Sequence, residues 1–278
     1  MLRRLGDRVA ELEIARTGPR AVLLTGSAAI GEADNNSDLD LILYHDEVPG
    51  YDQLAACRSE LGATEFVELG RADGELAEQF KVGAIDCQLA HSAVAAWDRE
   101  MDSVLVHLEV DSAVQKALGG LLEGIVLHDP DGLLESWRKR ASDYPEALRV
   151  AMVDANLVIP ATWYIADRLK ARDARLWLRE ELVDSAFRIL GVLAGLNRVY
   201  FSRFQFKRLH RFAHGLAMAP ADLADRLDLL VSGDDDLAVA TLEQLVVELR
   251  ALVELHLPAA RLPPLQRPPG TRHQAWGP

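Results

Sequence analysis

The hydrophobic periodicity of the chain changes once, near Ala93, and this change constrains the fold more than any other feature. Up to residue 92, short apolar runs with the strand period of two occur between polar loops, next to two stretches at helical spacing. Beyond it, apolar residues recur at helical spacing as far as residue 257. The pattern predicts an α+β protein, with a mixed sheet in an N-terminal domain at 1–92 and a C-terminal helical bundle at 93–257.

The chain ends at 258–278 in a segment with six prolines, a composition that favours a disordered tail. In the first domain we expect strands at 21–24, 39–44, 64–68 and 83–90 and helices at 2–16 and 51–61. In the second half, helices are expected at 114–125, 133–142, 146–170, 174–195, 203–217 and 236–256. Pro160 should kink the helix in which it lies.

The net charge excludes one large class of partners. At pH 7 the formal net charge is -13 and the pI is about 5.1, whereas binding to long DNA or RNA depends on clustered cationic side chains. No apolar run approaches the roughly 20 residues of a membrane helix, and the N-terminus carries charges where a signal peptide needs apolar residues. We therefore expect a soluble cytoplasmic protein without a membrane or long nucleic-acid partner.

The most informative segment runs from Gly26 and Ser27 through Gly31 to Asp38 and Asp40, at the head of an apolar strand. Gly26 can take a positive φ, so the chain can turn sharply and Ser27 can present its hydroxyl and N–H to phosphate oxygens. Side chains alternate along a strand, which places Asp38 and Asp40 on one face, about 6.6 Å apart at Cα. Without a cation these carboxylates would repel each other, so the pair predicts a metal site.

A third carboxylate, Asp86, lies on the expected strand 83–90. Ile85, Cys87 and Leu89 supply the apolar face of that strand, so Asp86 points to the opposite one. Hard divalent cations prefer oxygen ligands, and two ions about 3.5 to 4 Å apart stabilise both the attacking and the leaving oxygen of an in-line displacement. The three acids therefore predict a Mg²⁺ site that bridges a triphosphate.

This pattern resembles the DNA polymerase β-like nucleotidyltransferase superfamily: a Gly-Ser turn, eleven residues from Ser27 to an Asp-x-Asp, and one more acid on a later strand. The resemblance covers residues 20–90. The small enzymes of this superfamily that adenylylate aminoglycoside or lincosamide antibiotics also carry a C-terminal helical domain. The resemblance implies the following site residues: Gly26, Ser27 and Ser37 at the triphosphate, and Asp38, Asp40 and Asp86 at the metal. In some of the aminoglycoside enzymes the third acid is a glutamate, so a further role of Asp86 as general base stays open.

By this resemblance the chain transfers a nucleoside monophosphate, AMP from ATP, to a hydroxyl of a small-molecule acceptor and releases pyrophosphate. Mg²⁺ is the implied cofactor, and the cleft between the two domains is the expected active site. A role in antibiotic resistance rests on fold-level analogy alone. Two alternatives remain: a nucleotidyltransferase that adenylylates a protein toxin, which the helical half disfavours, and a non-catalytic nucleotide sensor, which the retained acids disfavour.

Candidate ligand contacts also occur in the helical half. Asn197, Tyr200 and Lys207 lie in an aromatic and basic stretch that either packs helices together or meets the nucleotide base and phosphates. Asp154 and Asn156 could reach the acceptor or could belong to a solvated helix face. The acids at 234–236 are expected to cap the following helix.

Overall fold

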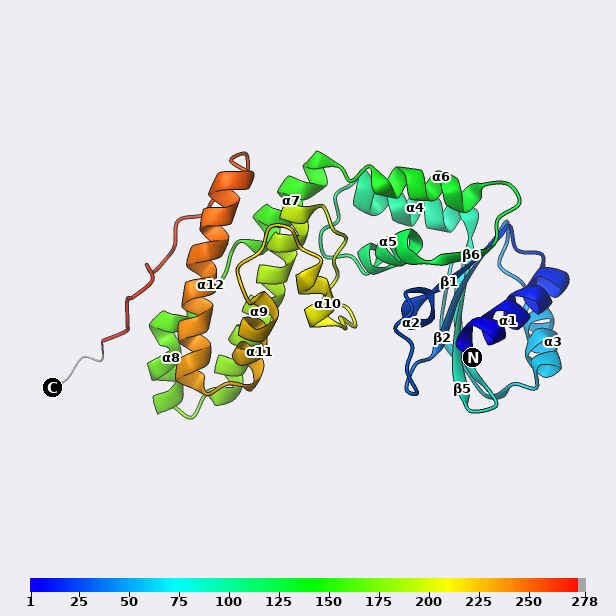
Figure 1. The fold of residues 1–278 in the computed structure, drawn as a ribbon, viewed down its shortest axis with the longest axis horizontal. Helices are drawn as coiled ribbons and strands as arrows, with labels where there is room; N and C mark the ends of the chain where they lie inside the picture. The colour runs from blue at the N-terminus through cyan, green and yellow to red at the C-terminus, as the bar shows by residue number, and fades with distance from the viewer. Residues whose placement is uncertain (275–278) are drawn as a thin grey trace. The chain divides into compact units, whose positions relative to one another are not determined.

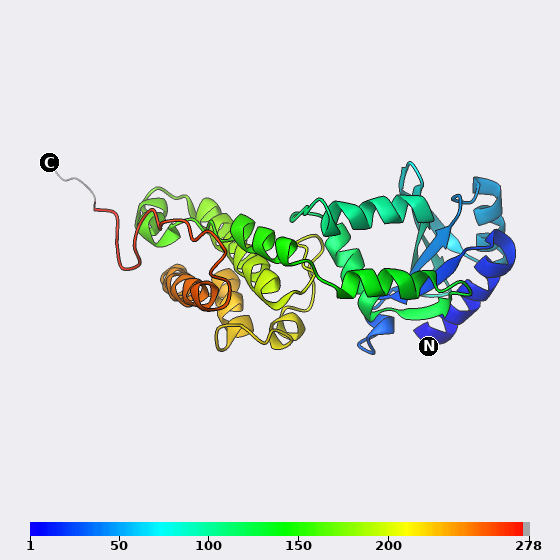
Figure 2. The same ribbon diagram turned by 90° about the horizontal axis from the view of Figure 1, so that it is seen from above.

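The computed structural model describes residues 1–274, which form two compact units. The first comprises Met1–His107 and Lys116–Asp143; the second comprises Leu108–Gln115 and the chain from Tyr144 onward. Among the described residues, every strand lies in the first unit, whereas the second is built from helices and loops (Figure 1 and Figure 2). The predicted α+β class, with a mixed sheet followed by a helical region, is confirmed.

The first unit contains a six-stranded sheet of order β3-β4-β5-β2-β1-β6. The strands are β1 (Ala21–Thr25), β2 (Leu39–His45), β3 (Thr64–Ala72), β4 (Glu75–Val82), β5 (Ile85–Ala93) and β6 (Ile125–His128). Only the central β2–β5 pair is parallel, and the other neighbours are antiparallel. The N-terminal ends of the two central strands, β2 and β5, therefore lie side by side at the same end of the sheet.

One face of this sheet forms the core of the first unit. Alternate residues of β2, among them Leu39, Leu41 and Leu43, are fully buried, as the strand periodicity predicts. They pack with neighbouring strands against α1 (Leu2–Thr17), and α3 (Tyr51–Leu61) lies on the same side (Figure 1). Asp40, on an alternate position of β2, must therefore face the other side, as must Asp38 just before the strand.

That other side is covered only in part. The first unit also contains α2 (Gly26–Ala29), α4 (Val94–Leu105), α6 (Leu133–Ser142) and, from Lys116 onward, α5 (Val114–Glu123). Near the C-terminal end of β2, Tyr44 packs against Trp97 of α4 and Trp137 of α6, with ring centroids 5.8 and 4.7 Å apart. Asp40, four residues earlier on the same face, is only half-buried. The aromatic cluster thus seals one end of this face and leaves the acidic end accessible.

Two strands and the unit boundary differ from the sequence prediction. β4 carries the buried Glu78 among its inward residues, paired with Arg58, and this charge conceals the strand period. β6 begins at Ile125, where the expected helix 114–125 ends, and its remaining residues were not assigned to any element. Because β6 pairs with β1, Lys116–Asp143 belong to the same unit as the sheet, together with Met1–His107, so this unit extends beyond residue 92.

The second unit is organised around one long helix, α9, whose C-terminal half is largely buried. Its helices are α7 (Glu146–Asn156), α8 (Thr162–Ala171), α9 (Arg175–Asn197), α10 (Leu209–His214), α11 (Leu223–Ser232) and α12 (Asp235–His256). Helix α9 contacts α7, α8, α11 and α12. Pro160 interrupts the stretch expected as one kinked helix, so α7 and α8 are separate, because proline removes a helical hydrogen bond. Asp234 caps α12 as predicted, accepting from the N–H groups of Asp236 and Leu237.

The proline-rich segment after Leu257 contacts helices of the second unit, and the disorder expected for it stays a prediction. Its carbonyl oxygens accept side-chain hydrogen bonds, including that of Pro268 from Trp163 Nε1 at 3.3 Å. Arg272 forms an ion pair with Glu243 at 2.9 Å. A proline-rich chain cannot build its own core, but it can lie extended along existing helices. Residues 275–278 of the predicted tail lie outside the described part of the chain.

None of the helices in the described residues combines the length and the apolar character that crossing a membrane requires.

Candidate active site

The turn after β1 brings a glycine against an aspartate. β1 ends at Thr25, which is the ladder partner of Asp40 on β2. Gly26 follows with φ of 66°, a conformation that side chains rarely adopt. A Cβ at this position would lie 2.1 Å from Oδ2 of Asp40, so the carboxylate occupies the space that the missing side chain leaves. The glycine is therefore required both by the backbone and by the position of Asp40.

The next residue, Ser27, contributes a hydroxyl without a protein partner. Its Oγ is buried, and no residue of the described chain forms a hydrogen bond with it. Its carbonyl oxygen accepts the N–H of Glu32 at 3.0 Å, which holds the turn in place. A buried hydroxyl without a partner is unfavourable by about 1–3 kcal/mol, so this atom is available to a ligand oxygen.

The parallel β2–β5 pair places the three predicted acids on one face. Leu39 pairs with Cys87, so Asp38, which precedes β2, lies level with Asp86 on β5. Asp38, Asp40 and Asp86 are all half-buried. The structure therefore brings these side chains to the same end of the same sheet face, as the alternation of the two strands predicts.

Two glutamines that the sequence reasoning missed bind two of these acids. Gln88 Nε2 donates to Asp38 Oδ2 at 3.2 Å, and Gln79 Nε2 donates to Asp86 Oδ1 at 3.3 Å. Gln88 follows Asp86 by two positions on β5, and this spacing was the available signal for it. Gln79 lies on β4, a strand that was not predicted. Both amides donate to a carboxylate without neutralising its charge.

Lys81 is the cationic residue that is paired with Asp86 in the sheet, but its ion pair is with Glu65. Lys81 on β4 pairs with Asp86 in the register of the sheet, but its ammonium donates to Glu65 Oε2 at 2.6 Å. The hydrogen bond to Glu65 raises the pKa of Lys81, with a smaller contribution from the charge of Asp86. Lys81 is therefore a permanent positive charge at the edge of the site.

The donor set fits a magnesium ion that is shared with a substrate. Among residues 1–274, no three His, Cys, Asp or Glu side chains are grouped so as to hold a metal alone. Mg²⁺, however, is usually bound through one or two carboxylates together with substrate phosphates and water. Asp38 and Asp40 supply hard oxygen ligands, and the unpartnered Ser27 hydroxyl belongs to the residue after Gly26, which packs against Asp40. The residues therefore fit a metal that arrives with a triphosphate.

The remaining residues predicted to contact the nucleotide lie in the loop before β2 and in the helical unit. Ser37 is part of the loop before β2, where its Oγ bonds to Asp34 at 2.9 and 3.0 Å, so it shapes the loop. In the helical unit, Asn197 accepts the Met218 N–H at 2.8 Å and donates to two carbonyl oxygens. Tyr200 is buried against Tyr144, with centroids 5.0 Å apart, whereas Lys207 is exposed. Asn197 and Tyr200 thus have packing roles within their own unit, and their contact with a nucleotide stays a prediction.

Comparisons with known proteins give distant matches. A family model described as a domain of unknown function (DUF4037) matches residues 112–205. A search of the curated proteins gives no match. Thirteen solved chains match. One is a nucleotidyltransferase-like protein from Exiguobacterium sibiricum 255-15, with TM-score 0.44 and 8% identity over 90% of this chain and 74% of that one.

A second solved structure concerns the activity of a cytoplasmic RNA terminal U-transferase. Its TM-score is 0.25 and its identity 19%, over 56% of this chain and 46% of that one. At these values neither structure defines the reaction of this chain, which has to be inferred from its own side chains.

Proposed function

We propose that the chain is a metal-dependent nucleotidyltransferase that transfers a nucleoside monophosphate to a hydroxyl of a small-molecule acceptor. The observation that carries the proposal is the packing of Asp40 against Gly26. It fixes the carboxylate that we propose as a metal ligand beside a sharp turn whose next residue, Ser27, has a buried hydroxyl without a partner. Such a pairing of carboxylate and turn suits a triphosphate that brings its own cation.

In this proposal the residues position the substrate and balance its charge. Ser27 donates its hydroxyl to a phosphate oxygen, and Asp38 and Asp40 hold the metal. Mg²⁺, when bound, supplies neutralisation of the charge that develops on the phosphate oxygens. Precise positioning and charge stabilisation then provide most of the rate, since phosphoryl chemistry asks for little covalent participation by the protein.

The transfer step forms one bond and breaks one. The acceptor hydroxyl oxygen bonds to the α-phosphorus, the bond between that phosphorus and the bridging oxygen breaks, and pyrophosphate leaves. The hydroxyl proton is taken by Asp86 in the proposal, because its carboxylate lies level with Asp38 on the same face. ATP is the proposed donor. A small acceptor is favoured over long nucleic acid by the net charge of -13.

The test starts with nucleotide binding, because it requires no knowledge of the acceptor. Calorimetry with the non-hydrolysable analogue α,β-methylene-ATP and Mg²⁺ should show binding by the wild type and loss of at least tenfold in affinity for Asp38→Asn and Asp40→Asn. Asp52→Asn is the matched control, because this aspartate is exposed on α3, on the opposite side of the sheet. Wild-type affinity in both site variants would refute the metal role of these acids.

A second measurement separates an enzyme from a sensor. Release of pyrophosphate from ATP and Mg²⁺ should be followed in the presence of a panel of hydroxylated small molecules and, separately, of protein acceptors. Release that depends on a small acceptor and is lost in Asp40→Asn supports the proposal. Release only with protein acceptors would make the chain a protein-modifying enzyme, and tight nucleotide binding without any release would make it a sensor.

A further inference from the structure

The helical unit contains a pocket of its own, separate from the acids of the sheet. It has a volume of about 140 Å³, several times the roughly 30 Å³ that a water molecule occupies in the liquid. All of its lining residues belong to the second unit. Drug-sized ligands occupy pockets of about 300–1,000 Å³, so this volume suits a smaller metabolite.

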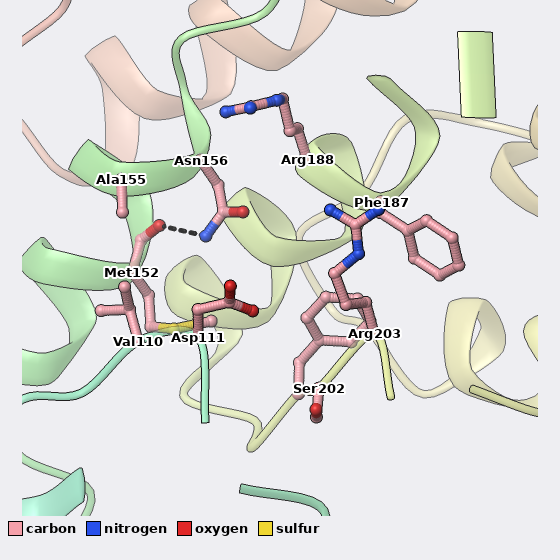
Figure 3. Close-up of a pocket in the computed structure, with 10 residues that line it drawn as sticks. Val110, Asp111, Met152, Ala155, Asn156, Phe187, Arg188, Ser202 and Arg203 are labelled. Carbon is pink, nitrogen blue, oxygen red and sulfur yellow. Dashed lines mark hydrogen bonds between the residues drawn. The ribbon is translucent and has the colours of Figure 1, made fainter. Parts of the chain in front are cut away.

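One side of the pocket presents two guanidinium groups (Figure 3). Arg188 Nε donates to Asp184 at 2.6 Å, and Arg203 Nη1 donates to the other oxygen of the same carboxylate at 2.9 Å. Burial raises the pKa of Asp184, but the hydrogen bonds from both arginines outweigh it and leave the pKa lowered, so this residue is ionised. Asp184 orients both arginines, whose remaining N–H groups make no other hydrogen bond within residues 1–274 and can bind a carboxylate.

The pocket also presents hydrogen-bond acceptors. Asp111 and Asn156 are among the residues that line the pocket (Figure 3). The Asn156 amide nitrogen donates to the Met152 carbonyl at 2.9 Å, which fixes the orientation of the amide. Within the described residues, neither the Asn156 Oδ1 atom nor the Asp111 carboxylate receives a hydrogen bond. These oxygens are suited to a ligand that donates, such as an ammonium group.

Helix α9 is adapted to hold Asn156 in this position. Gly191 lies in the middle of α9, where glycine is unfavourable by about 1 kcal/mol relative to alanine. A Cβ at Gly191 would meet the amide atoms of Asn156 at 2.5 to 2.7 Å. The glycine therefore gives the Asn156 side chain the space that it occupies at the pocket wall.

The charges around the pocket cancel. Arg188 and Arg203 are balanced by Asp184 and Asp111, so neither a simple anion nor a simple cation is favoured by net charge. Phe187 and Phe201 add apolar surface. A ligand that satisfies both sides must carry an anionic group and a cationic donor on one small molecule.

We propose that this pocket binds a small zwitterion of the amino-acid class, with its carboxylate at Arg188 and Arg203 and its ammonium at Asp111 and Asn156. The site lies wholly within the helical unit, so it does not depend on the proposed nucleotidyl transfer. Binding is expected in the absence of nucleotide and metal.

The experiment uses the full chain and the proteinogenic L-amino acids as probes. Each is screened by saturation-transfer NMR, and the best binder is measured by calorimetry next to its analogues that lack only the amine or only the carboxylate. We expect at least one amino acid to bind, and each analogue to bind at least tenfold more weakly. Absence of binding by every amino acid overturns the proposal, as does equal binding of either analogue.

Variants then locate the site. Asp111→Asn removes a charge that no described residue pairs with, so folding should be unaffected, and affinity should fall at least tenfold. Glu109→Gln, an exposed acid two residues away, is its control. Arg203→Gln should also lower affinity tenfold, whereas Arg172→Gln, an exposed arginine of the same unit, should not. Wild-type affinity in both Asp111→Asn and Arg203→Gln would place the binding elsewhere and refute the assignment.

Discussion

Substitution of Gly26 by alanine tests the central contact of the candidate active site. The new Cβ would lie 2.1 Å from Asp40 Oδ2, so the carboxylate would have to retreat by nearly 1 Å. The left-handed backbone adds roughly 1–2 kcal/mol for a residue with a side chain. Gly62 has φ of 67°, almost the 66° of Gly26, and no atom lies within 4 Å of its added Cβ. Gly62→Ala therefore reproduces the backbone strain without the displacement of Asp40.

The two variants should differ in nucleotide binding and agree in stability. Loss of one contact with a charged group weakens binding by about 1.5–3 kcal/mol, which is roughly a tenfold to 150-fold loss of affinity. Calorimetry with Mg²⁺ and α,β-methylene-ATP should show this loss for Gly26→Ala and unchanged affinity for Gly62→Ala. Thermal unfolding should show similar destabilisation of both. Equal affinities in the two variants would mean that the position of Asp40 does not matter for the nucleotide, and the reasoning would fail.

Two further predictions concern the stability of each unit. Burial, and next the charge of His91, lowers the pKa of His45 from 6.5 to about 3, so below pH 6.5 the unfolded chain binds a proton that the folded chain does not. The free energy of unfolding should therefore decrease as the pH is lowered from 6.5 towards 3, by up to about 1.4 kcal/mol per pH unit. The decrease should be less steep in His45→Gln, and identical pH profiles of the two proteins would contradict this. Truncation after Leu257 should lower the melting temperature, because it removes the contacts of Pro268 and Arg272 with α8 and α12, whereas an unchanged melting temperature would mean that these contacts contribute nothing.

Sequence periodicity predicted the strands and helices whose buried face is uniformly apolar. β2 alternates leucines with other residues, and its leucines are all in the core. β4 could not be found in this way, because its inward face includes Glu78, which is tolerated through its pairing with Arg58. β6 is too short and too apolar to be told from a helix end, and only its partner β1 makes it a strand. Such long-range pairing is not contained in a local pattern.

The candidate site was predictable where the chemistry follows from alternation. Asp38, Asp40 and Asp86 share a face because both strands have a period of two and run parallel in register. The contact between Gly26 and Asp40 joins residues fourteen positions apart and could be seen only in the structure. In the helical half, Asn197 was equally compatible with packing and with ligand binding, because a side-chain amide serves both. Its three backbone contacts within the second unit show the packing role.

The acidic end of the sheet has a charge that folding alone does not balance. Asp38 and Asp86 receive amide hydrogen bonds, which satisfy their oxygens but leave the negative charges in place. Lys81 could have neutralised Asp86, but its ammonium is directed to Glu65. In the buried part of the same unit, by contrast, Glu78 is paired directly with an arginine. Because the chain pairs its charge in the core and, within residues 1–274, gives Asp38 and Asp86 amide donors but no ion pair, the compensating charge there is best supplied by a ligand, as a metal-bound triphosphate would do.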